Sequence, residues 1–247
     1  MTRRLSVVIP VLNEAPRLRR LLPKLRRHLW DQDEIIVVDG ASTDDTVSVA
    51  EEGADKVLHC DRGRARQMNF GAERACGDLL WFLHADSGLR REQPAALRYL
   101  PEGPLWGRFD VRLKGHHPLF PIIGGAMNLR SRWTGIATGD QGIFVDRLMF
   151  LDVGGFPLQP LMEDVALSAC LRRHGKPLCL RPRMVVDSRR WQQHGVLRTV
   201  LLMWRLRWRY WRGADPAELH RIYYRDHFRD QGDGEAAPER EGGRDPG

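Results

Sequence analysis

The chain has 247 residues, of which 42% are hydrophobic and 29% charged; this composition favours one sizeable core and excludes a disordered, collagenous or coiled-coil protein. No apolar run approaches the ~20 residues that cross a bilayer, the N-terminal run is too short for a signal peptide, and the four cysteines form no CxxC pair, so we expect a cytoplasmic protein. The net charge is +7, and the basic body suits a partner with phosphate groups: a nucleotide, a nucleic acid or an anionic membrane surface.

Strands and helices are predicted to alternate over the first hundred residues. Short apolar runs indicate strands, and apolar residues at helical spacing separate them. Pro23 should kink or interrupt the first helix. Four strands alternating with three helices predict a parallel sheet with right-handed crossovers. The strands are expected at 5–10, 34–38, 56–60 and 79–84, and the helices at 18–29, 42–52 and 65–75.

The pattern is less regular beyond residue 100. No internal repeat and no linker rich in glycine, proline or serine divides the chain. We therefore expect one body over residues 1–229 and a tail at 230–247, which has almost nothing to bury and should be disordered. Further strands are expected at 106–113, 143–145 and 184–187, and further helices at 163–174, 196–212 and 215–228.

Polar residues follow each of the first four predicted strands. In open α/β sheets, ligands bind at the carboxyl ends of the strands, so these residues should share one edge. A purely structural sheet does not need this pattern. Asn13 and Glu14 follow the first strand, which ends at Pro10; Asp39 and Ser42 follow the second, Arg62 and Arg66 follow the third, and Asp86 follows the fourth, which ends at His84.

The chain has no GxGxxG after its first strand and no Walker A sequence, so a phosphate-bearing ligand must be held in another way. A divalent cation on a carboxylate is the obvious candidate. Asp86 directly follows an apolar strand and is placed to bind such a cation. The alternative is a cap for a helix starting near Glu92, which lies too far along the chain to fit well.

Several motifs in a fixed order resemble family 2 glycosyltransferases of the GT-A fold. The resemblance spans roughly residues 3–228 and implies an α/β fold: a Rossmann-like, mixed, mainly parallel sheet flanked by helices, with C-terminal helices. It also implies a nucleotide-binding half at 1–100 and an acceptor half at 101–229. The motifs are LSVVIPVLNE at 5–14, VVDGASTDDT at 37–46, RGRA and NFGA within 62–72, Asp86, and MED at 162–164.

A narrower resemblance points to a small bacterial subgroup labelled as associated with radical-SAM, selenium or arsenosugar genes. It depends on LHAD at 83–86, on MED, on the cluster Arg189, Arg190 and Trp191, and on GADP at 213–216. Arg190 and Trp191 are accordingly expected to bind substrate.

The resemblance implies roles on the donor side. Glu14 and Asp39 would contact the nucleotide, with Asp39 accepting a hydrogen bond from the base; capping of the following helix is the alternative for Asp39. Asp86 matches the last position of an Asp-x-Asp metal motif, where Mg²⁺ or Mn²⁺ would bridge the donor diphosphate. His84 replaces the first aspartate and could bind Mn²⁺, contact phosphate or sugar, or lie satisfied in the core. Arg62 and Arg66 either reach the diphosphate or belong to a solvated loop.

The resemblance also implies roles on the acceptor side. Asp164 matches the general base of inverting members, which need only this one carboxylate. Glu163 and Asp164 begin a predicted helix, so a favourable interaction with the helix dipole is the alternative for both. Asp140, between two glycines, resembles the acceptor-side loop, although a plain turn explains it nearly as well.

Residues 189–212 hold seven arginines, no acids and four of the eight tryptophans. As a helix they place Val200, Trp204, Trp208 and Trp211 on one stripe, which is typical of a helix at a membrane interface. Packing of these tryptophans against the domain is an equally open alternative. Peripheral contact with the inner face of an anionic membrane is the most that we expect. Nucleic acid is not an expected partner, because no RNP, helix-turn-helix or zinc-finger signature is present.

The sequence therefore predicts a cytoplasmic, metal-dependent, inverting glycosyltransferase that uses a nucleoside-diphosphate sugar of the UDP or GDP type. One alternative is a sugar nucleotidyltransferase, although the glycine-rich loop that such an enzyme needs after its first strand is absent. The other is a nucleotide- or lipid-binding adaptor without catalysis. The sugar and the acceptor are left open.

Overall fold

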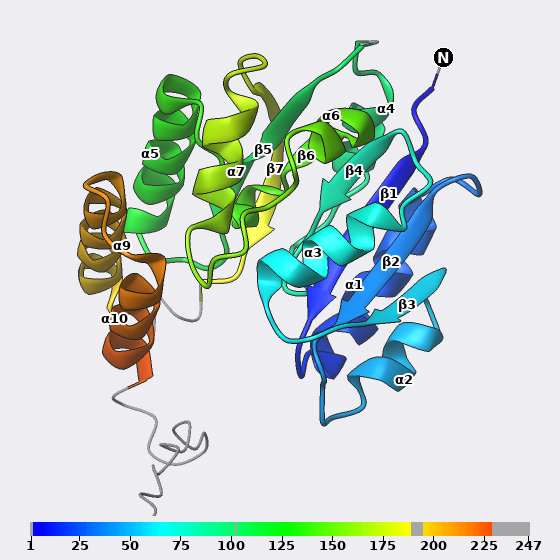
Figure 1. Cartoon of the computed structure of the whole chain (residues 1–247), viewed down its shortest axis with the longest axis horizontal. Coiled ribbons are helices and arrows are strands. Elements are labelled where there is room, and N and C mark those ends of the chain that lie inside the picture. The colour runs from blue at the N-terminus through cyan, green and yellow to red at the C-terminus, as the bar shows by residue number, and fades with distance from the viewer. Residues whose placement is uncertain (1, 102, 189–194, 229–247) are drawn as a thin grey trace, which may run out of the picture.

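The computed structural model describes residues 2–101, 103–188 and 195–228, and its centre is a seven-stranded sheet (Figure 1). The strand order is β3-β2-β1-β4-β6-β5-β7. Strands β1 to β4 run parallel, β6 is antiparallel to both of its neighbours, and β7 is parallel to β5. The predicted mixed, mainly parallel sheet is confirmed. The strands are β1 (Leu5–Val11), β2 (Glu34–Asp39), β3 (Lys56–His59), β4 (Leu79–Phe82), β5 (Trp106–Leu113), β6 (Phe144–Asp146) and β7 (Leu178–Val186).

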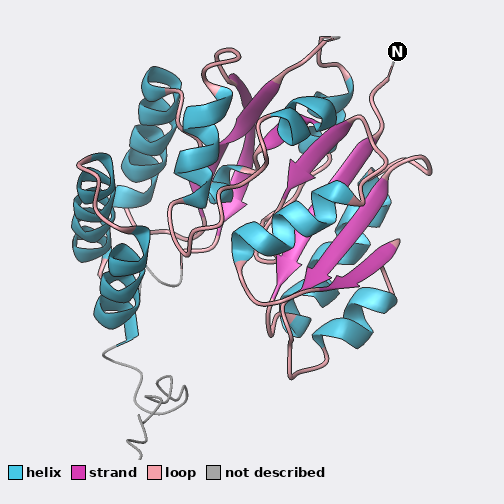
Figure 2. Cartoon of the chain, viewed as in Figure 1, coloured by secondary structure: helices cyan, strands magenta, loops and turns pink. Residues whose placement is uncertain are grey.

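Helices cover both faces of this sheet (Figure 2). Side chains alternate along a strand, so Val7 and Ile9 of β1 face helices α1 and α2, whereas Val8 faces α3 on the other side. This two-sided burial explains why the strands read as continuous apolar runs. The helices are α1 (Ala15–His28), α2 (Thr46–Glu51), α3 (Arg64–Glu73), α4 (Glu92–Arg98), α5 (Leu119–Thr134), α6 (Arg147–Asp152), α7 (Glu163–Leu171), α9 (Val196–Trp211) and α10 (Pro216–Phe228), with a 3-10 turn η1 (Gly139–Gln141).

Two local details in the first half differ from the prediction. Pro23 does not interrupt helix α1, because this residue lies on the exposed face while the leucines on the opposite face hold the helix to the core. Helix α2 begins at Thr46 rather than at Ser42, since the side chain of Asp39 accepts the backbone N–H groups of Ala41 and Ser42 and draws this segment into a loop.

The second half differs more from the prediction. Helix α5 was not expected, and its sequence contains Pro121, Gly124 and Gly125, all of which lower helix propensity. Strand β7 begins at Leu178, six residues before the predicted start, because it pairs with β5 along almost its whole length. In both places tertiary packing overrides the local signal.

The closing helices α9 and α10 pack against each other and against the loop before α7 (Figure 1). Their buried contact consists of Leu202, Leu206 and Leu219 with Met162. Within the described ranges, no helix combines the length and apolarity that a bilayer crossing requires. The predicted tail at 230–247 lies outside the described residues, as do Arg190 and Trp191.

Candidate active site

Hydrogen bonds of Asn13 link the loop that follows β1 to the loop that follows β2. Its side-chain Oδ1 accepts the backbone N–H of Thr43 at 2.8 Å, and its own N–H donates to Oγ of Ser42 at 2.9 Å. Asn13 has a φ of 54°, which asparagine tolerates better than most residues. Glu14 is held beside this contact by an ion pair with Arg17 at 2.5 Å. The structure thus brings Pro10, Asn13, Glu14 and Ser42 to one edge of the sheet, as predicted.

Asp39, at the end of β2, is 3% exposed. It accepts the N–H of Ala41 at 3.0 Å and that of Ser42 at 3.1 Å, so its carboxylate shapes the loop in which it lies. Gln67 of α3 was not singled out in the sequence, yet its Nε2 donates to the carbonyls of Val11 and Val38 at 2.8 Å each. These bonds link the ends of β1 and β2 to α3.

The chain turns sharply after β4. The Oγ of Ser87 accepts the N–H of His84 at 3.1 Å, and the N–H of Ser87 donates to the carbonyl of His84 at 3.0 Å. This turn leaves the Asp86 side chain exposed. The ring of His84 lies against Gly139 so closely that a Cβ atom there would be 2.5 Å from Nε2.

The turn η1 and the start of α7 complete the site. The backbone N–H of Gly139 donates to Oδ2 of Asp164 at 2.7 Å. The neighbouring Glu163 is 3% exposed, and its Oε1 lies 3.3 Å from Nη1 of Arg64 at the start of α3. Contacts therefore run without a break from His84 through Gly139 to Asp164, so the end of β4 and the start of α7 belong to one site.

Three carboxyl groups share this region, and their surroundings oppose ionisation of two of them. Burial raises the pKa of Asp140, and the charge of Asp164 raises it further, against the hydrogen bond from Thr138 and the charge of Arg207. Burial also raises the pKa of Glu163, again with a contribution from Asp164 and against the charge of Arg64. The charge of Asp164 thus contributes to the raised pKa of both neighbouring carboxyl groups.

Arg130 of α5 is a member of this site that sequence reasoning missed. Its Nε and Nη2 atoms are buried and have no hydrogen-bond partner among the residues that the structure describes. Burial, and then the like charge of Arg207, lower its pKa to about 10, while Asp140 and Asp164 act in the opposite direction. The omission followed from the missed helix, since no pattern placed residue 130 near the site.

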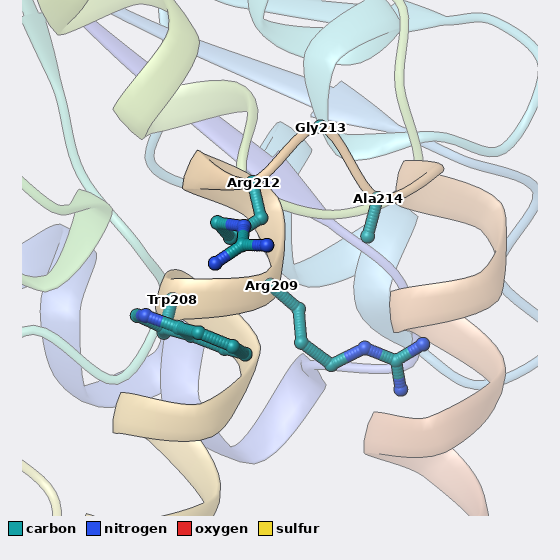
Figure 3. A pocket seen from close by; sticks show the side chains of 5 residues that line it. All are labelled: Trp208, Arg209, Arg212, Gly213 and Ala214. Carbon is teal, nitrogen blue, oxygen red and sulfur yellow. The ribbon is translucent and has the colours of Figure 1, made fainter.

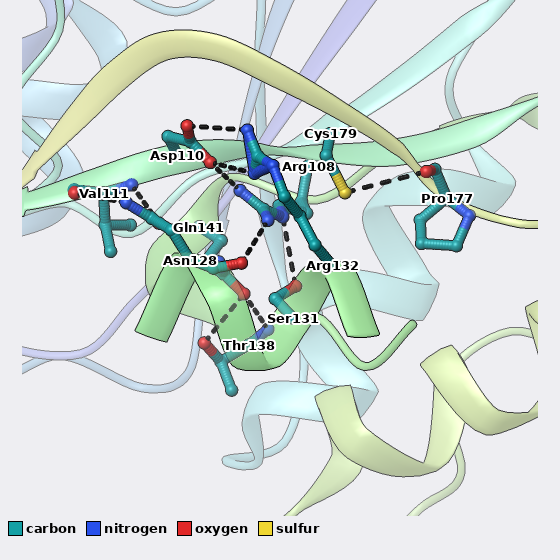
Figure 4. Close-up of polar contacts among 10 residues, drawn as sticks. All are labelled: Arg108, Asp110, Val111, Asn128, Ser131, Arg132, Thr138, Gln141, Pro177 and Cys179. Carbon is teal, nitrogen blue, oxygen red and sulfur yellow. Dashed lines mark hydrogen bonds and ion pairs between the residues drawn. The ribbon is translucent and has the colours of Figure 1, made fainter. Parts of the chain in front are cut away.

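A buried polar network holds α5 in place behind the site (Figure 4). Arg108 of β5 is fully buried and donates to Oγ of Ser131 and to the carbonyl of Asn128, both at 3.0 Å. Arg132 forms two bonds with Asp110, at 2.7 and 2.8 Å. Such paired and satisfied charges fix the orientation of α5, the helix that carries Arg130.

Arg62 and Arg66, which follow β3, both lie near other titratable side chains. Arg66 pairs with Asp61, and both side chains are at least half exposed, so the pair contributes little to stability. The pKa of His220 in α10 is lowered by burial and then by the charge of Arg62, which places Arg62 near α10. Contact of either arginine with a diphosphate stays a prediction.

A resident cation would have few protein ligands here. Across the described part of the chain, no group of three or more His, Cys, Asp or Glu side chains is arranged to hold a metal ion. Asp86 offers one exposed carboxylate at the end of β4. Mg²⁺ is often bound by one or two carboxylates together with substrate phosphates, so Asp86 fits a cation that arrives with a diphosphate and does not fit an all-protein cage.

We compared the chain with known protein families and relatives. Residues 6–96, from β1 into α4, match the family described as Glycosyl transferase family 2. A PGL/p-HBAD biosynthesis glycosyltransferase of Mycobacterium tuberculosis is 29% identical over 174 residues, which are 62% of this chain and 63% of the relative. The chain thus spans less than two thirds of the length of that relative.

Two solved structures share the fold. The mannosyltransferase PcManGT from Pyrobaculum calidifontis, in complex with GDP-Man and Mn²⁺, matches with a TM-score of 0.65 and 20% identity over 92% of this chain and 70% of its own. TarS 1–349 from S. aureus, in complex with UDP-GlcNAc, matches with a TM-score of 0.60 and 17% identity over 75% and 59%. Residues 6–96 therefore match glycosyltransferase family 2, and the chain has the GT-A fold of these two structures.

Proposed function

We propose that the chain is an inverting glycosyltransferase that moves a sugar from a nucleoside-diphosphate donor to an acceptor hydroxyl. The observation that carries the proposal is the contact from His84 through Gly139 to Asp164, which joins the turn that carries Asp86, the candidate diphosphate-side carboxylate, to a candidate base. The resemblance of the chain to a protein named as a glycosyltransferase, and to structures that hold GDP-Man or UDP-GlcNAc, supports the same reaction class.

In this proposal residues 1–100 bind the donor. Pro10, Asn13, Glu14, Asp39 and Ser42 line the nucleotide, and the fastened loops after β1 and β2 give it a rigid floor. Asp86, with His84 beside it, would hold Mg²⁺ or Mn²⁺. When bound, the cation would neutralise the charge that develops on the departing diphosphate. Arg62 and Arg66 would add positive charge at the same edge.

Residues 101–229 bind the acceptor. Asp164 removes the proton of the acceptor hydroxyl, and the N–H of Gly139 keeps its carboxylate oriented for that task. Inversion needs one such carboxylate and no protein nucleophile. Asp140 and Glu163 shape the acceptor pocket together with Arg130. Arg190 and Trp191, which lie outside the described residues, are proposed to contact substrate on the basis of the sequence alone.

We place the reaction in the cytoplasm, in accord with four cysteines that are all free thiols. The narrower resemblance to the radical-SAM, selenium or arsenosugar subgroup stays a prediction, since the relatives reported above carry other names. Of the two rival functions, a sugar nucleotidyltransferase would form a different product, and an adaptor without catalysis would form none.

The test is a screen of nucleotide sugars, UDP-GlcNAc and GDP-Man among them, with Mn²⁺, with Mg²⁺ and with EDTA. We expect one donor with a cation to raise the melting temperature, because ligand binding stabilises the folded state by mass action. We also expect release of the matching nucleoside diphosphate, slowly with water and faster with an acceptor. Release of pyrophosphate would favour the nucleotidyltransferase, and binding without turnover across donors and acceptors would favour the adaptor.

A further inference from the structure

Helix α9 exposes an apolar stripe on the side opposite its buried face. The stripe consists of Leu197, Leu201, Trp204, Trp208 and Trp211. At 100° per residue, these five positions fall within an arc of about 80° around the helix axis. Thr199, Leu202 and Leu206, which hold the helix to the body, lie on the far side of the helix. The alternative that the tryptophans pack against the domain is therefore wrong. The five side chains of the stripe are 57–80% exposed.

Arginines border this stripe. Arg198, Arg205 and Arg212 follow one edge of it, and α9 contains no acidic residue. Arg209 is paired with Glu218 of α10 at 2.7 Å. The guanidinium of Arg212 lies 5.1 Å from the ring centroid of Trp208 (Figure 3). The exposed face is thus both apolar and cationic.

An open hollow of about 350 Å³ lies at the C-terminal end of the stripe. Figure 3 shows the Trp208 ring and the Arg212 side chain next to each other at this hollow, with Arg209 directed toward α10. An indole ring beside a guanidinium matches the boundary of a bilayer, where the ring sits at headgroup depth and the cation meets lipid phosphate. The lining residues are Trp208, Arg209, Arg212, Gly213 and Ala214.

We propose that this face of α9 binds the surface of an anionic lipid bilayer. The charge of the face selects this occupant: two copies of the chain docked through it would bring arginines against arginines, whereas anionic headgroups complement them. The contact is peripheral, because the apolar side chains form one stripe on an otherwise polar or buried helix. The proposal does not depend on the enzymatic activity.

The test is co-sedimentation of the full chain with phosphatidylcholine vesicles that contain or lack phosphatidylglycerol. We expect binding to the anionic vesicles only, weakening as salt is added. Combined Trp204→Ser, Trp208→Ser and Trp211→Ser should weaken it about tenfold or more. Combined Arg198→Gln, Arg205→Gln and Arg212→Gln should weaken it on the order of 100-fold, near fivefold for each arginine. Tyr99→Ser, which removes an 83% exposed aromatic ring from the nucleotide half, is the matched control.

Circular dichroism and melting temperature check that each variant is folded. Leu197→Glu is a second variant of the stripe, which changes only one residue. Equal binding by the tryptophan variant and the Tyr99→Ser control would overturn the proposal. Equal binding of the wild type to vesicles with and without phosphatidylglycerol would overturn it too. A dimer that the tryptophan changes dissociate, without vesicle binding, would assign the face to a second copy and overturn it. Binding of single-stranded RNA through the stripe, without vesicle binding, would do the same.

Discussion

The backbone N–H of Gly139 donates to Oδ2 of Asp164 at 2.7 Å, and it joins two segments that are 25 residues apart in the chain. The bond leaves Oδ1 to the N–H of Val165 at 2.7 Å. Both oxygens are therefore oriented by backbone donors, which do not titrate and need no side-chain ordering. In the proposed reaction, a carboxylate held in this way would be oriented before the acceptor arrives.

Asp164→Asn should slow the proposed sugar transfer strongly while preserving the fold. The amide oxygen can still accept the N–H of Gly139, but the side chain can no longer take a proton. We expect kcat to fall about 100- to 10,000-fold with little change in donor affinity. Steady-state kinetics with the donor found in the screen, together with a donor titration, measure both quantities. Full activity of the variant would remove Asp164 from the role of base.

Asp86→Asn should weaken the cation-dependent part of donor binding. The exposed carboxylate is the one anionic ligand that the end of β4 offers, so its loss should raise the donor Kd in Mn²⁺ by at least about tenfold and leave the Kd in EDTA unchanged. Calorimetric titration with and without the cation measures this difference. Asp152→Asn, an exposed aspartate on α6, is the matched control. An unchanged Mn²⁺ effect in Asp86→Asn would place the cation elsewhere.

Gly139→Ala should reduce activity more than stability. The new Cβ atom would come within 2.5 Å of Nε2 of His84, so the imidazole ring must move, and the contact that links the two halves of the site is lost. A displacement of this size can cost up to about 100-fold in kcat, while the ring itself can rotate at little cost in folding free energy. Gly175→Ala is the control, because nothing lies within 4 Å of its Cβ position. Kinetics and urea unfolding of both variants would show the contrast, and equal kinetics would contradict it.

Asp140→Asn should change how stability depends on pH. Burial, aided by the charge of Asp164, raises the pKa of Asp140, so the folded state holds this proton more tightly than the unfolded chain. The resulting contribution is fully present below the ordinary pKa and is lost as pH rises through the raised one. Asparagine keeps an acceptor for the Thr138 hydroxyl and carries no charge. We therefore expect the melting temperature of the variant, relative to wild type, to rise between about pH 4 and pH 7. If the difference in melting temperature between the variant and wild type does not change with pH, the pKa of Asp140 is not raised in the folded state.

Much of the structure of residues 1–100 could be predicted from the sequence, because the strands there are buried on both faces and helices alternate with them. A continuous apolar run such as Ile35–Val38 has few other structural solutions. The polar residues after these strands share an edge for the same reason, since parallel strands end on one side. The sequence thus sufficed to bring Asn13 and Ser42 together.

The structure beyond residue 100 could not be predicted in the same way. Helix α5 contains two glycines and a proline, and it depends on the buried bonds of Arg108 and on Asn128, which accepts and donates to the backbone of Val111 at 2.8 and 3.1 Å. None of these partners is local in the sequence. Arg130 entered the site only through this helix.

The sequence by itself determined the order of the first four strands and the three helices between them, the edge of the sheet at which the candidate donor residues gather, and the apolar and cationic character of α9, because each follows from spacing along the chain. Only the tertiary structure decided that His84, Gly139 and Asp164 touch, that Arg130 lies beside Asp140 and that the tryptophans of α9 face outward. These relations join segments that no periodic pattern connects, and packing free energy, rather than local propensity, selects them.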